Sequence, residues 1–247
     1  MPHAPADPTP TSPNFNARRG GAVPALVVIH YTAMPSCAAA RARLCDPAHE
    51  VSAHWLIAED GTPEALVDES LRAWHAGAGA WGGAADVNSR SIGIELANSG
   101  DAPFPEPQMA ALERLLGQIL TRWHIPPEGV IAHSDMAPAR KRDPGPRFDW
   151  RRLALAGLSV WPDGDTPAAA RAEAAGDAAK DIPDDLPAAF RRAASAFGYP
   201  DAAPEALLAA FRARFRPWAE GPLSVQDLRR IDSLARHHPS ARPAPGT

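Results

Sequence analysis

Cysteine is scarce in this sequence, and the two that occur are poorly placed to form a bridge. Cys37 and Cys45 stand eight positions apart on a stretch that is typical of one helix. Positions i and i+8 of a helix lie about 12 Å apart along its axis, which is too far for a disulfide. The pair also lacks zinc-finger spacing. We therefore expect two free thiols, and a disulfide-stapled scaffold is excluded.

A basic surplus and long apolar runs are also missing. The formal net charge is −4 and the pI is about 6.1, so the sequence shows no overall charge that would attract nucleic acid. No apolar run approaches the ~20 residues of a membrane span, so none is expected. Residues 1–22 are rich in proline, serine and asparagine and lack the basic start and apolar segment of a secretory signal. We expect them to be flexible and the protein, as written, to be cytoplasmic, with the periplasm as the alternative.

What the sequence does contain is a run of chemically active residues in a turn-rich segment, Ile131–Pro146. His133 ends a short apolar run, as a residue at the tip of a buried strand does. The prolines and glycine that follow exclude a long regular element before Asp143, so a stiff loop is expected to return Asp143 toward His133. An imidazole and a carboxylate held together in this way are two of the three protein ligands of a catalytic zinc, whose fourth position is left for water.

The third ligand is expected at the end of another buried run, 25–32, which carries His30. If the two apolar runs are neighbouring strands, His30 and His133 meet at one edge of the sheet. The strand 88–98 alternates, with Glu95 on the side opposite its large apolar residues. A buried carboxylate needs a partner, a shifted pKa or a polar cleft, so Glu95 is either in a structural salt bridge or acts on water at the metal. Lys141, on the same loop as Asp143, is placed to stabilise an oxyanion.

The order of predicted elements indicates an α/β fold with a mixed central β-sheet flanked by helices. Pro105–Ile125 has the periodicity of an amphipathic helix that packs on the sheet, and a further helix begins near Phe148. We divide the chain into a flexible segment at 1–22, a zinc-binding catalytic domain at 23–162, a linker at 163–185 and a small three-helix domain at 186–238. The three helices are expected at 186–197, 204–215 and 224–235, with apolar faces sufficient for a small core.

Five motifs together resemble one family, the type-2 N-acetylmuramoyl-L-alanine amidases of the AmiD/AmpD type, which are related to phage lysozyme-amidases and peptidoglycan recognition proteins. They are Val-Ile-His30-Tyr-Thr, Ser-Ala-His54-Trp-Leu-Ile, Ala-Trp-His75-Ala-Gly, Ser-Ile-Gly-Ile-Glu95-Leu, and the segment from Ala-His133-Ser-Asp through Lys141-Arg-Asp143-Pro-Gly-Pro. The resemblance runs in order from about residue 23 to 162. It implies that His30, His133 and Asp143 bind Zn²⁺ and that Glu95 and Lys141 are catalytic. Residues 186–238 are similar to the helical peptidoglycan-binding domain of the AmiD branch, whose members are commonly exported lipoproteins.

The resemblance implies hydrolysis of the amide between N-acetylmuramic acid, or its anhydro form, and L-alanine in peptidoglycan or muropeptides. Such an enzyme serves cell-wall degradation, peptidoglycan turnover or muropeptide recycling. Two other functions stay open: a peptidoglycan-binding receptor without activity, and a zinc peptidase that cuts within the stem peptide. His75 and Asn88 are expected beside the cleft as substrate contacts, and His54 is expected to be a half-buried structural histidine. Trp74 and Trp81 either cover the core edge or form a wall that contacts sugar or peptide.

Overall fold

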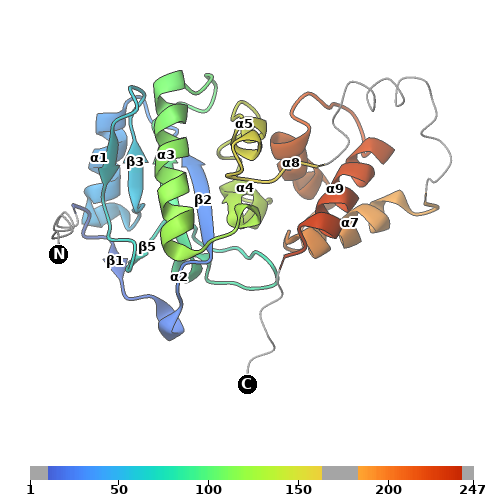
Figure 1. Cartoon of the computed structure of the whole chain (residues 1–247), viewed down its shortest axis with the longest axis horizontal. Helices are drawn as coiled ribbons and strands as arrows, with labels where there is room; N and C mark the ends of the chain where they lie inside the picture. The colour runs from blue at the N-terminus through green and yellow to red at the C-terminus, as the bar shows by residue number, and fades with distance from the viewer. Residues whose placement is uncertain (1–10, 163–182, 241–247) are drawn as a thin grey trace.

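The computed structural model describes residues 11–162 and 183–240, and its centre is a mixed five-stranded sheet (Figure 1). The strands are β2 (Leu26–Tyr31), β3 (Trp55–Ile57), β4 (Pro63–Ala65), β6 (Ser91–Leu96) and β7 (Val130–Ala132). Their order is β4-β3-β6-β2-β7; β3, β6, β2 and β7 run parallel, and β4 is antiparallel to β3. The predicted α/β fold with a mixed sheet is confirmed.

The two faces of the sheet have different neighbours. Helix α3 (Glu106–Trp123) lies across one face and packs on the odd-numbered side chains of β2 and the even-numbered side chains of β6. These side chains are Val27, Ile29, Ile92, Ile94 and Leu96. The alternation places Leu26 and Val28 on the opposite face, in a second core cluster. His30 follows Leu26 and Val28 in this alternation, so its side chain also lies on the face opposite α3. We therefore expect the candidate metal-binding residues on that face.

The remaining elements of residues 11–162 are short. They are β1 (Phe15–Asn16), η1 (Arg19–Gly21), α1 (Cys37–Cys45), η2 (Pro47–His49), β5 (Arg72–Ala73), α2 (Val87–Arg90), η3 (Pro127–Gly129), α4 (His133–Met136) and α5 (Trp150–Leu155). Cys37 and Cys45 lie at opposite ends of α1 as free cysteines, as expected. Ser36 caps this helix, since its hydroxyl accepts a hydrogen bond from the Ala39 amide.

Residues 11–22 differ from the flexible segment that composition predicted. Phe15 and Asn16 pair with β5 in a two-stranded sheet. The Ser12 hydroxyl donates to the Leu44 carbonyl at 2.6 Å, and the Arg18 guanidinium donates to the carbonyl of Ser89 at 2.9 Å. The segment is held by backbone carbonyl groups of α1 and α2, which are distant in sequence, and composition carries no information about such partners.

Three helices follow: α7 (Leu186–Phe197), α8 (Pro204–Phe215) and α9 (Val225–His237). They match the three predicted helices and are called here the helical segment. Most of the predicted linker, 163–182, lies outside the described residues. The helical segment lies beside α4 and α5 (Figure 1). It shares one apolar core with the face of the sheet opposite α3, where Val28 and Ile131 pack in the same cluster as Phe197, Phe211 and Phe215. Among the described helices, none combines the length and apolarity needed to cross a bilayer.

Gly198 marks where the helical segment meets the loop after β5. Its φ is +138°, and an added Cβ would lie 2.6 Å from the Trp81 ring. We expect Gly198→Ala to lower the free energy of unfolding by about 1–3 kcal/mol, because the tryptophan has to move. Gly117→Ala, in the middle of α3, is the matched control: its Cβ meets its nearest atom at 3.7 Å, so it should stabilise by about 0.5–1 kcal/mol. Urea unfolding of both variants checks the pair, and equal stability of the two contradicts this reading.

Candidate metal centre and active site

The parallel register of β2 and β7 brings two histidines to one point. Ile29 stands opposite Ala132, so the next residues along, His30 within β2 and His133 directly after β7, come to lie side by side. Their Nδ1 atoms are 2.9 Å apart. The two histidines meet because β2 and β7 run parallel. The two apolar runs in the sequence did not determine whether these strands are parallel or antiparallel.

The loop after α4 returns a carboxylate to the same point, as expected. Asp143 Oδ2 lies 3.0 Å from His30 Nδ1 and 2.9 Å from His133 Nδ1. The Ser134 amide donates to the Asp143 carbonyl at 3.0 Å, which fixes the loop against α4. Within the described residues, His30, His133 and Asp143 form a group that could hold a metal ion.

The tautomer of His133 follows from its second nitrogen. Nε2 lies 2.9 Å from the carbonyl oxygen of Ala76, which can only accept a hydrogen bond. In the neutral ring the proton is therefore on Nε2, and Nδ1 presents its lone pair toward the carboxylate of Asp143. Metal-ligating histidines are commonly oriented by such a bond from the other ring nitrogen.

A chain of hydrogen bonds fixes His30 in the same way. The Ser91 hydroxyl donates to the Val87 carbonyl at 2.6 Å, so its oxygen accepts from His75 Nε2 at 3.2 Å. His75 Nδ1 is then an acceptor and takes the proton of His30 Nε2 at 3.0 Å. His30 Nδ1 is consequently a bare lone pair as well.

When both rings are neutral, three acceptor atoms face one another here at 2.9–3.0 Å. Burial, with His133 next to it, lowers the pKa of His30 to about 4 against the opposing effect of Asp143, so this imidazole is neutral at pH 7. The lone pairs of these three atoms repel one another unless a cation lies between them. Ligand atoms bonded at 2.0–2.1 Å to a tetrahedral zinc ion stand about 3.3 Å apart. The two Nδ1 atoms and the carboxylate oxygen therefore fit a zinc-sized ion after small shifts.

Glu95 stands beside His30 in the β2/β6 register and lines the same cavity. Burial and the nearby Asp143 raise the pKa of Glu95 to about 8, while Lys141 acts in the opposite direction. Its Oε2 atom is buried and has no hydrogen-bond partner among residues 11–162 and 183–240. The salt bridge considered for Glu95 is therefore absent from the described structure, and the carboxyl group faces the cavity with one oxygen free to accept.

The cavity has a volume of about 400 Å³, and its lining includes Lys141, Trp74 and His75. Asn88 differs from the expected substrate contact. It is buried, does not line this cavity, and uses its side-chain oxygen to accept from the amides of His75 at 3.1 Å and Ala76 at 2.7 Å. Asn88 therefore holds the loop that supplies Ala76 to His133. Trp81, the other aromatic residue of this loop, is buried in the core.

Two residues of the site were missed by sequence reasoning. Ser91 ends the hydrogen-bond chain of His30, and Arg140 donates to the carbonyls of Ala76 at 2.6 Å and Ala78 at 2.7 Å. Arg140 stood in the basic run before Asp143, which gave no sign of these partners. Gly93 is also required, since a Cβ there would lie 2.4 Å from Cγ of the His75 ring.

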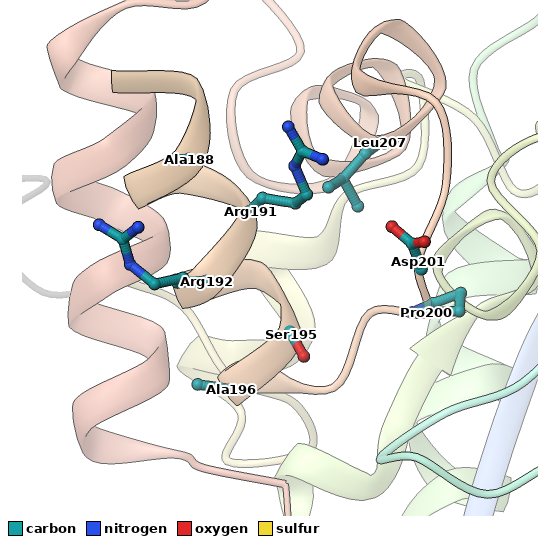
Figure 2. Close-up of a pocket in the computed structure, with 8 residues that line it drawn as sticks. All are labelled: Ala188, Arg191, Arg192, Ser195, Ala196, Pro200, Asp201 and Leu207. Atoms are coloured by element: carbon teal, nitrogen blue, oxygen red, sulfur yellow. The ribbon is translucent and has the colours of Figure 1, made fainter. Parts of the chain in front are cut away.

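A larger hollow of about 640 Å³ lies on the helical segment (Figure 2). Arg191 of α7 extends toward Leu207 of α8, and Asp201 stands in the connection between the two helices. Arg192 points away on the other side of α7. The hollow has no cluster of metal-ligating side chains in the described residues, so the chemistry belongs to the smaller cavity.

His54 is structural, as expected, and fully buried instead of half-buried. Its Nδ1 accepts from the Gly93 amide at 2.9 Å, and its Nε2 donates to the Leu71 carbonyl at 3.1 Å. Burial lowers the pKa of His54 to about 3, against the backbone contact with Leu71.

This pKa shift predicts a loss of stability in acid. The unfolded chain binds the proton near pH 6.5 and the folded chain only near pH 3, so the contribution of His54 is complete above pH 6.5 and is lost as the pH falls toward 3. The limiting slope is about 1.4 kcal/mol per pH unit. In metal-free protein, His54→Gln should flatten the decline measured by urea unfolding between pH 6.5 and 4.5. His49→Gln, on the surface, should leave it unchanged; identical slopes in all three proteins would contradict the assignment.

Comparison with known proteins agrees with this geometry. Residues 20–146 match the N-acetylmuramoyl-L-alanine amidase family. The chain is 45% identical over 154 residues to the N-acetylmuramoyl-L-alanine amidase AmiD of Escherichia coli K12; the alignment covers 56% of this chain and 55% of that protein.

Two solved structures resemble the described fold over nearly its whole length. One is E. coli AmiD in complex with the substrate anhydro-N-acetylmuramic acid-L-Ala-D-γ-Glu-L-Lys, with a TM-score of 0.76, 32% identity, and coverage of 92% of this chain and 99% of that one. The other is AmpDh3 of Pseudomonas aeruginosa in complex with anhydromuramic pentapeptide, with a TM-score of 0.76, 30% identity, and coverage of 97% and 100%. By sequence and by fold, the chain belongs to the AmiD/AmpD-like branch of the type-2 N-acetylmuramoyl-L-alanine amidase family.

Proposed function

We propose that this protein is a zinc-dependent N-acetylmuramoyl-L-alanine amidase that hydrolyses the amide between N-acetylmuramic acid, or its anhydro form, and L-alanine of the stem peptide. The observation that carries the proposal is the cluster of His30, His133 and Asp143 with the unpartnered carboxyl of Glu95 in the same cavity. Family membership supports the bond that is cut, and the donor set of two imidazoles and one carboxylate suits zinc.

Three residues of the protein would hold the ion. His30 and His133 direct bare Nδ1 lone pairs at one point because His75 and the Ala76 carbonyl take their other protons. Asp143 supplies the third donor and one negative charge. Zinc bound there supplies Lewis acidity, which lowers the pKa of water and polarises the amide carbonyl.

Glu95 is the general base and acid of the reaction. Its pKa, raised to about 8, brings the group close enough to the working pH to take a proton from the attacking water and then deliver it to the leaving nitrogen of L-alanine. Lys141 lines the same cavity, where its ammonium stabilises the negative charge that develops on the carbonyl oxygen as water adds. The C–N bond then breaks, leaving the lactyl carboxylate on the sugar and a free amine on the peptide.

The cavity also suits a muropeptide. Its rim carries the cations Arg140 and Arg142, and Trp74 provides an aromatic surface. A stem peptide joined through γ-Glu retains a free α-carboxylate, which complements this charge, and a sugar ring packs on an aromatic face. The AmiD and AmpDh3 structures contain anhydromuramyl peptides of this kind, and we extend that substrate class to this chain.

Glu95→Gln should lower the hydrolysis rate by about 10²–10⁴-fold, because the amide cannot accept the proton of water. Bound zinc should stay at the wild-type level, since Glu95 is not one of the three donors. Glu64→Gln, which changes a surface carboxylate paired with Arg41, should retain full activity. Rates and metal content of the purified proteins check this, and wild-type turnover in the Glu95 variant removes the proposed base.

Mass analysis of digested anhydromuropeptides tests the bond that is cut. We expect free sugar acid and an intact peptide that begins with L-alanine. Shortened peptides still attached to sugar would establish the zinc peptidase instead. Retention on peptidoglycan with no product and no metal would establish the receptor. A chelator should abolish product formation, and added zinc should restore it.

A further inference from the structure

Asp135 is the deepest charged residue next to the metal centre, and the reaction does not use it. It is fully buried and lies two positions after His133 in the short helix α4. Its Oδ2 atom accepts from the Ala132 amide at 2.8 Å, so the carboxylate clamps the turn that carries His133. Its other partners come from the helical segment.

Arg214 of α8 brackets this turn from both sides. One guanidinium nitrogen donates to Asp135 Oδ2 at 2.5 Å, and the other donates to the Val130 carbonyl at 2.8 Å. The side chain is 1% exposed, and its guanidinium lies over the rings of Trp150, at 4.3 Å, and Phe215, at 4.7 Å. Val130 precedes His133 by three residues and Asp135 follows it by two, so one planar group fixes both ends of the turn.

Tyr199, just after α7, makes the second connection. Its hydroxyl donates to Asp135 Oδ1 at 2.7 Å, and its ring packs against Trp81. The loop that carries Trp81 is in turn held by the Ala80 amide, which donates to the Met136 carbonyl at 3.0 Å. The same loop presents the Ala76 carbonyl to His133.

We propose that the helical segment is a working part of the metal centre: Arg214 and Tyr199, acting through Asp135, are positioning residues that hold His133 in its ligating orientation. This inference rests on the metal centre of the proposed function. It assigns α7 and α8 a role in metal affinity that is independent of any contact with peptidoglycan.

The chemistry of the contact argues for positioning over simple stabilisation. A buried ion pair gains little net stability, because desolvating both charges offsets their attraction, and apolar residues of similar size often serve as well. What Arg214 and Tyr199 supply here is a fixed geometry, with one bond from each to Asp135 and a further bond from Arg214 to the Val130 carbonyl. Groups that orient metal ligands commonly change metal affinity 10–100-fold when they are removed.

The chain contains a matched control two positions away. Arg212, also on α8, forms a buried ion pair with Asp227 of α9 at 2.6 Å and donates to the carbonyls of Gly221 and Pro222. This pair has the same chemistry as Arg214–Asp135 but lies wholly within the helical segment.

The experiment uses the full chain and three variants: Arg214→Lys, Tyr199→Phe and Arg212→Lys. Lysine keeps the charge but cannot reach Val130 and Asp135 at once, and phenylalanine keeps the ring without the hydroxyl. Zinc dissociation constants are measured by competition with a chromophoric chelator, and bound Co²⁺ is followed by its visible absorption. Circular dichroism at the same temperature shows that each protein is folded.

We expect Arg214→Lys and Tyr199→Phe to weaken zinc binding at least tenfold and to alter the Co²⁺ spectrum. Arg212→Lys should change zinc binding less than twofold, even where it lowers the melting temperature as much as Arg214→Lys does. If Arg214→Lys does not fold, Tyr199→Phe decides.

Wild-type zinc affinity in both Asp135-contact variants overturns the inference, and so does an equal loss in Arg212→Lys. If zinc affinity falls in Arg214→Lys but not in Tyr199→Phe, Arg214 is a positioning residue and Tyr199 is not. A wild-type chain that binds no zinc overturns the metal centre itself, and with it the proposed function.

Discussion

The structure depends on holding three hydrogen-bond acceptors against one another. Two imidazole nitrogens and a carboxylate oxygen lie within 3.0 Å of one another, an arrangement that is unfavourable when their lone pairs face each other and becomes favourable around a cation. The parallel register, the hydrogen bonds behind each ring and the loop anchored by Ser134 all prevent these groups from turning away. Because the groups that hold it are buried, the site is set before any ion arrives, which limits the reorganisation needed on binding.

Much of this was predictable from the sequence for definite reasons. His30 and His133 each end an apolar run, and side-chain alternation placed Glu95 opposite the large apolar residues of its strand, as observed. The stiff loop before Asp143 follows from its prolines and glycine. The register between strands was beyond reach, because β2 and β7 are about a hundred residues apart in sequence. The roles of Ser91 and Asn88 were missed for the same reason: each acts on a neighbour's backbone or ring, and residue type does not show which neighbour that is.

The two ends of the described chain show the same limit. The periodicity and capping residues of α7, α8 and α9 gave three helices with nearly correct bounds, since those signals are local. Their docking on the sheet depends on pairs such as Arg214 and Asp135, which are 79 positions apart. Residues 11–22 were expected to be flexible because their composition is polar and proline-rich, yet they are held by hydrogen bonds to distant carbonyls.

The sharing of one core between the sheet and α7–α8 has a consequence for how such chains can be recombined. A cut in the predicted linker, residues 163–185, looks like a natural boundary for exchanging C-terminal segments between relatives, but the contacts that decide compatibility are those made to Asp135. A chimera whose new C-terminal module lacks a cation and a hydroxyl at the positions of Arg214 and Tyr199 leaves the buried carboxylate of Asp135 without counter-charge, two residues from the candidate metal ligand His133. A C-terminal segment from a relative is therefore compatible only if it supplies partners for Asp135. Where it does not, Asp135 has to be replaced by a neutral residue.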